Sequence, residues 1–477
     1  MRLVVGFDFD LTLVDSADGI VATFLETASR LGVAIEADAV RATIGVPLEE
    51  TWAALIGPHR APEAAALYRR LYPEFGVPVT TLLPGAAEAV AAVRSHGGRA
   101  FVVSAKADHL VHASLDHVGL DVDGVVGNRY GAAKGEALRD LGAEVHVGDH
   151  PNDMVGARAA GAVAIGVTTG PHDAAALRAA GADVVLDGLD AFPEWLDGYV
   201  LDRRLALLDT RLRELGSVVV AFSGGADSAF LLTAAVRALG ADRVLAATAV
   251  SSSLPRRELL AAREFAEGLG VRHVRPRTDE MSRDGYRAND GDRCYFCKAE
   301  LLEVLRPVAD REGFDHVATG TNADDAVAGF RPGIRAAAER GAVTPLLDAG
   351  LTKAQVRAAS RRWNLATWDK PAAACLSSRI AYGLEITPAR LARVDRAEAA
   401  LRTVLTTAGV PVRNLRVRDV GDTARIEVDG HLVDRVRELE EAVAAVRAAG
   451  FETVEVDTRG FRSGAMNELL PDPARYR

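Results

Sequence analysis

The sequence predicts an α/β protein with two doubly wound parallel-sheet domains and a small C-terminal α/β domain. Short β-branched runs alternate with helical stretches through the first 200 residues, and the same alternation starts again at about residue 201. The chain has 477 residues, which is too long for a single hydrophobic core. We therefore place domains at 1–198, with a helical cap at about 16–82, at 199–380 and at 381–477.

Composition narrows the class of protein. Hydrophobic residues make up 49% of the chain and charged residues 26%, as in soluble globular proteins. No apolar run approaches the roughly 18 residues of a membrane-spanning helix, and the first residues have a strand pattern rather than that of a secretion signal. We therefore expect a cytoplasmic protein with no membrane partner. The net charge of −10 argues against general nucleic-acid binding.

Polar residues follow the predicted strands of the first domain, where a parallel sheet of this kind binds its ligands. The strand candidates span 3–9, 100–103, 145–147 and 162–167. The polar residues are Asp8 and Asp10 after the first strand, Ser104 after the second, Lys134 in AAKGEAL, and Asp149 and Asp153 in GDHPND. In order and type they resemble the four motifs of the haloacid dehalogenase-like phosphatase superfamily, over roughly 1–198.

This resemblance implies an aspartyl-phosphate mechanism with Mg²⁺. Asp8 is the expected nucleophile, because a carboxylate needs a cation beside it to attack an anionic phosphate. Asp10 is the expected acid and base, since the leaving oxygen of a phosphate ester needs a proton. Asp149 is expected to complete a magnesium site with Asp8 and Asp10, and Asp153 to support it.

The resemblance further implies that Ser104 and Lys134 hold the transferring phosphoryl group. Leu11 stands where close relatives carry Gly, a change that tightens the loop without removing a functional group. A decayed domain kept only for packing is the alternative, and the filled catalytic positions argue against it. The fusion alone motivates the hypothesis that this domain acts on a phosphorylated by-product or a damaged nucleotide near the pathway of the second domain.

The second domain contains a glycine-rich loop, FSGGADS at 222–228, before a helix predicted over 226–239. Glycines let backbone N–H groups approach a phosphate, and the start of a helix favours the same anion. The spacing differs from the GxxxxGK[ST] of kinase-type loops. It resembles the pyrophosphatase loop of enzymes that split ATP into AMP and pyrophosphate. The residues assigned to ATP are Ser223, Gly224, Gly225 and Ser228, with Asp227 as a ligand of Mg²⁺.

Further strands are predicted at 245–250, 271–274 and 317–320, with a helix from about residue 256. A turn is expected over 321–325. It contains Asp324 and Asp325, which either serve magnesium or substrate or are simply solvated.

The chain has three cysteines, Cys294, Cys297 and Cys375. In a chain of this length they cannot form a disulfide framework, which points to metal or catalytic chemistry. The CxxC spacing of the first two fits a redox pair, half of a zinc site or two buried thiols. No histidine stands at a convincing spacing for zinc, whereas three thiolates suit a cubane iron–sulfur cluster with one iron left open.

Six segments together are similar to the LarE family of ATP-dependent sulfur transferases, over roughly 203–470: SGGADS, CYFCK, GTNADD, ACLSSRIAYG, NLRVRD and GFRSGAMNE. The resemblance implies that ATP adenylates a carboxylate of pyridinium-3,5-biscarboxylic acid mononucleotide. Sulfur then gives a thiocarboxylate, for the nickel-pincer cofactor of lactate racemase. Some members sacrifice the sulfur of the cysteine matching Cys375, while others deliver sulfide from a [4Fe-4S] cluster held by three cysteines. This chain resembles the cluster type, with sacrifice of Cys375 as the alternative.

An acidic protein must gather positive charge locally to bind such a nucleotide. Arg416 and Arg418 are two residues apart on a predicted strand and therefore share a face. With Arg462 they correspond to the family's phosphate-binding arginines, and a planar guanidinium can donate two hydrogen bonds to a phosphate. Glu427 is expected to orient the arginines, and Lys298 to stabilise charge on the adenylated intermediate. Solvated arginines in an arginine-rich chain are the alternative.

Other acceptors and a non-enzymatic role fit the sequence less well. A tRNA thiolase should carry a basic face or an RNA-binding domain, and neither is visible. An amide synthetase fed by glutamine would need a glutaminase domain, and an assembly platform would not need the filled carboxylate positions. We expect a nucleotide-like substrate, sulfide or another sulfur donor as partners, and a homo-oligomer by family resemblance.

Overall fold

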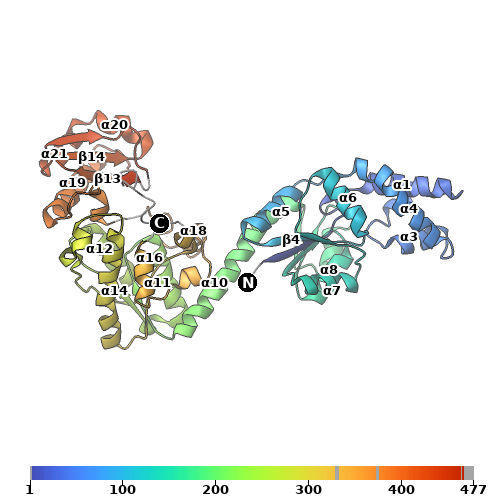
Figure 1. The fold of residues 1–477 in the computed structure, drawn as a ribbon, viewed down its shortest axis with the longest axis horizontal. Coiled ribbons are helices and arrows are strands. Elements are labelled where there is room, and N and C mark those ends of the chain that lie inside the picture. Colours follow the sequence, from blue (N-terminus) through green and yellow to red (C-terminus); the bar gives the residue numbers. More distant parts are fainter. Residues whose placement is uncertain (1–2, 328–331, 372–374, 463–464, 467–477) are drawn as a thin grey trace. The chain divides into compact units, whose positions relative to one another are not determined.

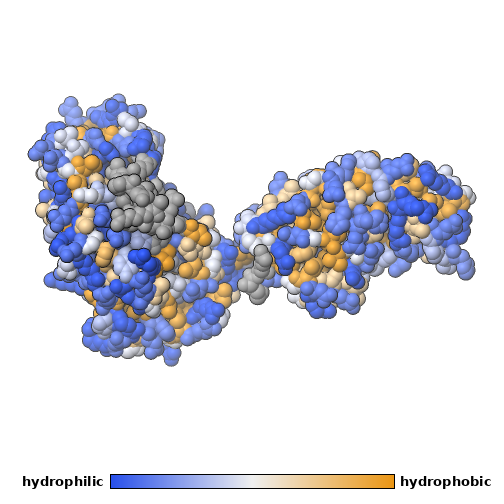
Figure 2. Space-filling model, viewed as in Figure 1, coloured by the Kyte–Doolittle hydropathy of each residue, from blue (hydrophilic) through white to orange (hydrophobic). Residues whose placement is uncertain are grey.

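The computed structural model describes residues 3–327, 332–371, 375–462 and 465–466. The chain forms two compact units, Met1–Val200 and Leu201–Arg477 (Figure 1). Helix α10 (Phe192–Leu215) contains the boundary, since its first part packs on the core of the first unit and its last part on the core of the second. Hydrophilic residues cover much of the face seen in Figure 2, with apolar residues among them. Within the described residues, no helix has the length and apolar character needed to cross a membrane.

A six-stranded parallel sheet, in the order β5-β4-β1-β6-β7-β8, forms the middle of the first unit. Strand β1 lies between β4 and β6, so the strand order reverses there. The loops after these three strands therefore meet at one edge of the sheet. The strands are β1 (Val4–Phe7), β4 (Arg99–Val103), β5 (Gly124–Val126), β6 (Val145–Gly148), β7 (Val163–Val167) and β8 (Val184–Leu186).

Helices cover both faces of this sheet, as a doubly wound fold requires (Figure 1). Helices α5 and α6 and the start of α10 pack around Val5 and Phe7 on one face. Helix α7 packs against Val4 and Val103 on the other face, where α8 and α9 pack against Ala164. The helices are α5 (Ala86–Ser95), α6 (Asp108–Val118), α7 (Ala132–Leu141), α8 (Pro151–Ala160) and α9 (Ala174–Ala179).

The cap is a helical insert between two short antiparallel strands, β2 and β3. It has a core of its own, in which the rings of Phe24 and Trp52 stack with centroids 4.6 Å apart. The sequence predicts a mostly helical insert over about 16–82. The elements are β2 (Val14–Asp15), α1 (Ala17–Arg30), α2 (Ala37–Arg41), α3 (Leu48–Ile56), α4 (Ala61–Phe75) and β3 (Thr81–Leu82).

The second unit begins with a four-stranded parallel sheet in the order β11-β10-β9-β12. The end of α10 packs on one face with α11, α12 and α18, and α14 and α16 pack on the other. The strands are β9 (Val218–Ala221), β10 (Val244–Ala247), β11 (Arg272–Val274) and β12 (His316–Ala318). The helices are α11 (Ala226–Leu239), α12 (Arg256–Gly268), α13 (Asp284–Arg287), α14 (Arg293–Glu312), α15 (Ala323–Val327), α16 (Pro332–Glu339), α17 (Pro345–Asp348) and α18 (Lys353–Arg362).

Two local predictions for this sheet are wrong. The predicted strand 245–250 ends at Ala247, and the side chain of the next residue, Thr248, donates a hydrogen bond to the carbonyl of Phe222. The predicted turn over 321–325 is the start of α15. Asn322 begins that helix, because its side-chain oxygen accepts hydrogen bonds from the backbone N–H groups of Asp324 and Asp325.

A three-stranded sheet in the order β13-β14-β15 forms the last part of the second unit. Its β13–β14 pair is antiparallel and its β14–β15 pair parallel. The core around Val417 and Ile426 includes residues of α19, α20 and α21 (Figure 1). The elements are α19 (Pro388–Thr407), β13 (Leu415–Val420), β14 (Thr423–Val428), α20 (Val433–Arg437), α21 (Glu440–Ala448) and β15 (Thr453–Val456).

Candidate active sites

Three buried carboxylates meet at the carboxyl ends of β1 and β6. Asp8 follows β1, Asp149 follows β6, and Asp153 lies in the first turn of α8. One ligand atom of each lies within 4.8 Å of the other two. Lys134 of α7 reaches the same point, with Nζ 3.0 Å from an oxygen of Asp8 and 2.5 Å from one of Asp153. The hydroxyl of Thr12 donates to Asp149 at 3.0 Å.

Burial and charge give these groups different proton affinities. Burial, followed by the nearby Asp153, raises the pKa of Asp8 to about 7. Burial, followed by Asp8, also raises the pKa of Asp149. Burial opposes the charged form of Asp153 too, but Lys134 outweighs it and holds that pKa below its usual value. Three buried carboxylates, two of which have raised pKa values, fit Mg²⁺, which prefers oxygen ligands.

Asp10 lies outside this carboxylate group and lines a cavity of about 410 Å³ between the cap and the sheet. Its Oδ1 accepts hydrogen bonds from Ser16 at 2.5 Å and from Lys106 at 2.6 Å. The Lys106 ammonium also donates to the hydroxyl of Tyr72 in α4 at 2.6 Å. Among the described side chains, the carboxylate grouped with Asp8 and Asp149 is that of Asp153, and the assignment of Asp10 to a magnesium site stays a prediction.

The two remaining predicted residues of this site lie in loops after β1 and β4. Ser104 is buried, and its Oγ accepts a hydrogen bond from the backbone N–H of Lys106 at 3.2 Å. Leu11 has a φ of 58°, in the left-handed region that glycine adopts without strain. The structure thus gives the Gly-to-Leu departure a specific consequence, which is backbone strain beside Asp10.

The phosphate loop connects β9 to α11. Gly224 has a φ of 70°, which a glycine accommodates freely. The hydroxyls of Ser223 and Ser228 lie 3.1 Å apart, and α11 begins directly after Gly225, so its positive end faces the loop. A cavity of about 330 Å³ opens here. Its lining includes Ser223, Gly225, Asp227, Ser228, Lys298 and Asp325.

Charged side chains surround this cavity. Desolvation lowers the pKa of Lys298, which extends from α14. The ammonium of Lys353, the first residue of α18, lies 3.6 Å from Asp227. Burial raises the pKa of Asp227, and its Oδ1 is buried with no hydrogen-bond partner among the described residues, which leaves it available to a cation. Asp325 faces the cavity, whereas the Asp324 carboxylate accepts a hydrogen bond from the backbone N–H of Lys353.

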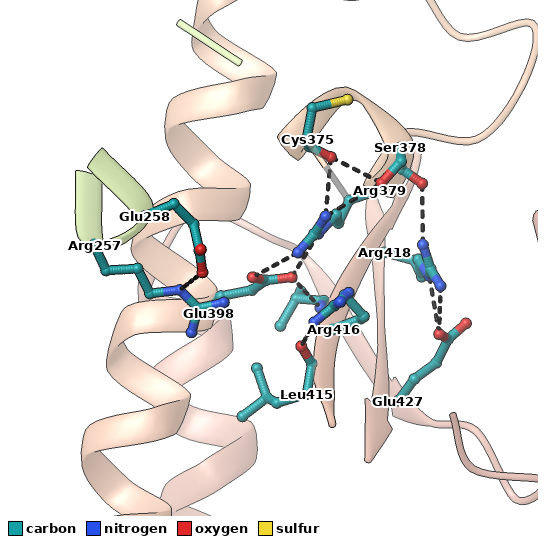
Figure 3. Close-up of polar contacts among 11 residues, drawn as sticks. Arg257, Glu258, Cys375, Ser378, Arg379, Glu398, Leu415, Arg416, Arg418 and Glu427 are labelled. Atoms are coloured by element: carbon teal, nitrogen blue, oxygen red, sulfur yellow. Dashed lines mark hydrogen bonds and ion pairs between the residues drawn. The ribbon is translucent and has the colours of Figure 1, made fainter. Parts of the chain in front are cut away.

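Cys375 precedes a short 3₁₀ turn, Leu376–Arg379, beside the C-terminal sheet. Its backbone carbonyl accepts hydrogen bonds from Arg379 at 2.9 Å and from the Ser378 hydroxyl at 2.8 Å. Arg379 is 1% exposed and forms an ion pair with Glu398 of α19, at 2.9 Å. The sulfur of Cys375 points away from this pair (Figure 3).

The other two cysteines lie three residues apart in the first turn of α14 and therefore on one side of that helix. Burial, followed by Cys375, raises the pKa of Cys297. Burial alone lowers the pKa of Arg293. The electrostatic effects of Cys375 and Cys294 act in the opposite direction and help to raise that pKa above its ordinary value. The three cysteines therefore lie around a common region.

Arg418 connects the C-terminal sheet to the turn after Cys375. Its Nε and Nη2 both donate to one oxygen of Glu427, at 3.0 and 2.7 Å, and its Nη1 donates to the carbonyl of Ser378 at 3.0 Å (Figure 3). Glu427 thus fixes the orientation of this guanidinium next to the cysteine turn.

Arg416 lies two residues earlier on β13 and is also buried. Burial, followed by the positive charge of Arg379, lowers the pKa of Arg416 to about 10. Its guanidinium is 5.3 Å from the centroid of the Phe461 ring, and Arg462 is the next residue along the chain. The negative charge of Glu398, which pairs with Arg379, acts on Arg416 in the opposite sense and offsets part of this repulsion.

Comparison with known proteins assigns each of the two units to a protein family. The first matches the haloacid dehalogenase-like hydrolase family over residues 5–167. It is 32% identical over 207 residues to "Probable phosphatase IndB" of Dickeya dadantii, a match that covers 39% of this chain and 90% of that protein. The first unit is a haloacid dehalogenase-like domain.

The second unit matches the NAD synthase family over residues 201–285. An uncharacterized protein of Synechocystis is 40% identical over 274 residues, which cover 57% of this chain and 99% of that protein. Pyridinium-3,5-bisthiocarboxylic acid mononucleotide synthase of Lactiplantibacillus plantarum is 35% identical over 271 residues, which cover 57% of this chain and 96% of that protein. The chain belongs to this LarE family. Its LarE unit is the C-terminal one, and it carries a nucleotide-binding fold of the NAD synthase type.

Sequence reasoning missed several residues of the LarE unit and one of the phosphatase-like domain. The sequence contains a signal for Lys353, because the first position of a helix, directly after a Thr cap, is an unfavourable place for a cation. The pairing of Arg379 with Glu398 had none, since 18 residues separate the two in the sequence and only the fold brings them together. Lys106 likewise meets Asp10 only through the sheet.

Proposed function

We propose that the LarE unit is an ATP-dependent sulfur transferase. It adenylates a carboxylate of pyridinium-3,5-biscarboxylic acid mononucleotide, releases pyrophosphate, and then exchanges AMP for sulfur to give a thiocarboxylate. The observation that carries this proposal is the position of Cys375. Its turn is fixed by Arg379 on one side and contacted by Arg418 on the other, so the sulfur-bearing segment lies next to the anion-binding arginines. The name of the Lactiplantibacillus plantarum relative supports the choice of product.

Activation of the carboxylate takes place at the phosphate loop in this proposal. The loop N–H groups and the start of α11 bind the ATP phosphates, while Lys298 and Lys353 balance their charge. Asp227 would hold Mg²⁺ through its unsatisfied buried oxygen. Arg416, Arg418 and Arg462 bind the phosphate and carboxylates of the mononucleotide.

The sulfur source in this proposal is a [4Fe-4S] cluster that Cys294, Cys297 and Cys375 would hold. Such a cluster would supply exchangeable sulfide at the iron that no cysteine ligates. Arg293 is placed to stabilise the thiolate forms of these cysteines. Single-turnover sacrifice of Cys375 is the competing route and uses the same acceptor geometry.

Anaerobic assays of the full chain test this reaction. Wild-type protein with ATP, Mg²⁺, sulfide and pyridinium-3,5-biscarboxylic acid mononucleotide as acceptor should give pyrophosphate, AMP and a product in which sulfur replaces oxygen, detected by mass spectrometry. Asp227→Asn should lose pyrophosphate release, whereas Cys375→Ala should keep pyrophosphate release and lose both AMP release and thiocarboxylate. Iron bound to the wild type and lost in Cys375→Ala supports the cluster, and loss of H₂S from Cys375 after one turnover supports sacrifice instead.

We also propose that the N-terminal domain is a Mg²⁺-dependent phosphatase. Asp8 attacks the phosphorus, Lys134 and Ser104 hold the phosphoryl oxygens, and Asp10 protonates the leaving oxygen and later activates water. Asp8, Asp149 and Asp153 would hold Mg²⁺, which neutralises charge on the phosphoryl group. Hydrolysis of a generic phosphomonoester that survives in Asp8→Asn would contradict the assignment of the nucleophile.

A further inference from the structure

Lys370 connects the phosphate loop to the segment that carries Cys375. Its Nζ donates to the backbone carbonyl of Gly224 at 2.9 Å and to a carboxylate oxygen of Glu258 at 2.7 Å. Lys370 lies five residues before Cys375 in the chain. We propose that Lys370 is a positioning residue. It orients the phosphate loop for ATP and couples the position of the Cys375 segment to that of the loop. The role of Lys370 at the phosphate loop does not depend on the proposed sulfur transfer. Only its consequence at Cys375 rests on that proposed function.

The contact with Gly224 fixes one peptide plane of the loop. The peptide between Gly224 and Gly225 is trans, so its carbonyl and its N–H point in opposite directions. Lys370 holds the carbonyl from outside, and the N–H of Gly225 is directed at the hydroxyl of Ser223 at 3.4 Å. Ser223 and Gly225 both line the ATP cavity. A lysine that holds the carbonyl therefore keeps an N–H donor turned towards the place where phosphate binds.

Lys370 acts from behind the loop and is not itself a phosphate ligand. It is absent from the described residues that line the ATP cavity. Its charge is compensated by Glu258, which is 8% exposed and lies in the first turn of α12. An acidic side chain is favourable at the start of a helix, which fixes the carboxylate and through it the ammonium. A lysine that already has a buried counter-ion contributes little net attraction for ATP, and its effect is on the geometry of the loop.

Described residues on both sides of Cys375, Lys370 before it and Leu376 after it, contact the ATP half. Upstream, Lys370 contacts Gly224. Downstream, the N–H of Leu376 donates to the carbonyl of Ser253 at 2.9 Å, and the Ser253 hydroxyl donates to Glu280 at 2.8 Å. Binding of phosphate to the loop therefore stabilises the peptide that Lys370 holds, and we infer that this effect extends to Cys375.

Two measurements on the full chain test this role. The first is equilibrium binding of a non-hydrolysable ATP analogue, which needs no sulfur acceptor. Lys370→Met should weaken binding about tenfold, the loss expected for a hydrogen bond from a charged donor, and Lys370→Arg should recover part of it. Glu258→Gln, which leaves the ammonium in place but frees it, should give a smaller loss.

The second measurement is hydrogen exchange of the backbone amides at 375–379 with and without the analogue. In wild type the analogue should slow exchange in this segment, and in Lys370→Met, at saturating analogue, it should not. Amides of β1 in the N-terminal unit serve as the internal reference. Slowing of equal size in both proteins, or unchanged analogue affinity in Lys370→Met, would overturn the proposal. If Lys370→Met does not fold, the exchange measurement is made on Lys370→Arg instead. The positioning role predicts that the analogue slows exchange at 375–379 less than in wild type, whereas a merely structural role predicts the same slowing as in wild type. Failure of thiocarboxylate formation in the wild type would leave both readouts intact, so the two hypotheses fail separately.

Discussion

Arg379 and Glu398 form a fully buried ion pair that fixes the backbone of Cys375. The Arg379 guanidinium donates to both carboxylate oxygens of Glu398, at 2.9 and 3.3 Å, and to the Cys375 carbonyl at 2.9 Å. Glu398 also accepts a hydrogen bond from the N–H of Val417 in β13 at 3.2 Å. One side chain of α19 therefore ties the cysteine turn to the sheet that carries Arg416.

Glu398→Gln should destabilise the LarE unit by about 3–5 kcal/mol, because it leaves the charge of Arg379 buried without its partner. Chemical denaturation followed by fluorescence measures this free energy of unfolding. The matched control is Glu441→Gln on the exposed side of α21, which should change stability by less than about 0.5 kcal/mol. A loss below about 1 kcal/mol for Glu398→Gln would mean that the pair is not the anchor of the turn.

Arg418→Lys should raise the KM for the mononucleotide about tenfold and leave the KM for ATP unchanged. A lysine has one point of charge, so it cannot keep both hydrogen bonds to Glu427 and the one to Ser378 while also binding an anion. Steady-state kinetics with each substrate varied in turn separates the two constants. Arg435→Lys, at an exposed position of α20, controls for loss of an arginine as such. An effect of Arg418→Lys on the KM for ATP alone would contradict the assignment.

The stabilisation of the phosphatase-like domain by Mg²⁺ should grow as pH rises from about 5 to 8. The pKa of Asp8 is about 7 in the fold against an ordinary value of 3.8, so in this window the metal-free folded state binds more protons than the unfolded state. Metal-free stability therefore falls with rising pH up to about 7 and then levels off. Mg²⁺ must displace that proton, so its own stabilisation increases over the same range.

Thermal unfolding of the full chain with and without Mg²⁺, measured across this range, checks the expectation. Asp8→Asn removes the titrating group and should flatten the pH dependence of the metal-free Tm in the first unit. A Tm shift by Mg²⁺ that is equal at pH 5 and pH 8 would contradict it.

The sequence predicted the sheets well because their strands are short, apolar and followed by ligand-binding loops. The helix predicted over 226–239 matches α11, since a glycine pair precedes it and Gly240 follows it. The alternation expected to start again at about residue 201 in fact begins with α10, which starts at Phe192. The hydrophobic stripe of that helix changes partner between the two cores, so no single period marks its length.

The chemistry-bearing residues were predictable where they lie in one loop and not where the fold assembles them. The serines and glycines at 223–228 form a local signal that the structure keeps together. Lys106 and Lys370 act on partners 96 and 146 positions away, Asp10 and Gly224. Their hydrogen bonds depend on sheet order and on the route of the chain back to the loop, which residue type and spacing do not encode.

Leu11→Gly should leave the stability of the first unit within about 1 kcal/mol of wild type, whereas Leu11→Ile should lower it by about 1–2 kcal/mol. Leu11 has a φ of 58°. Glycine removes the strain at that angle but gains freedom in the unfolded chain, so the two effects offset each other. A β-branched residue keeps the apolar contact and adds strain, because its side chain crowds the left-handed backbone. Leu25→Ile on α1, where the leucine is 39% exposed, is the control and should change stability by less than about 0.5 kcal/mol. Thermal and urea unfolding of the three variants should rank Leu11→Ile lowest, and equal stability of the two isoleucine variants would show that the loop after β1 relaxes the strain at Leu11.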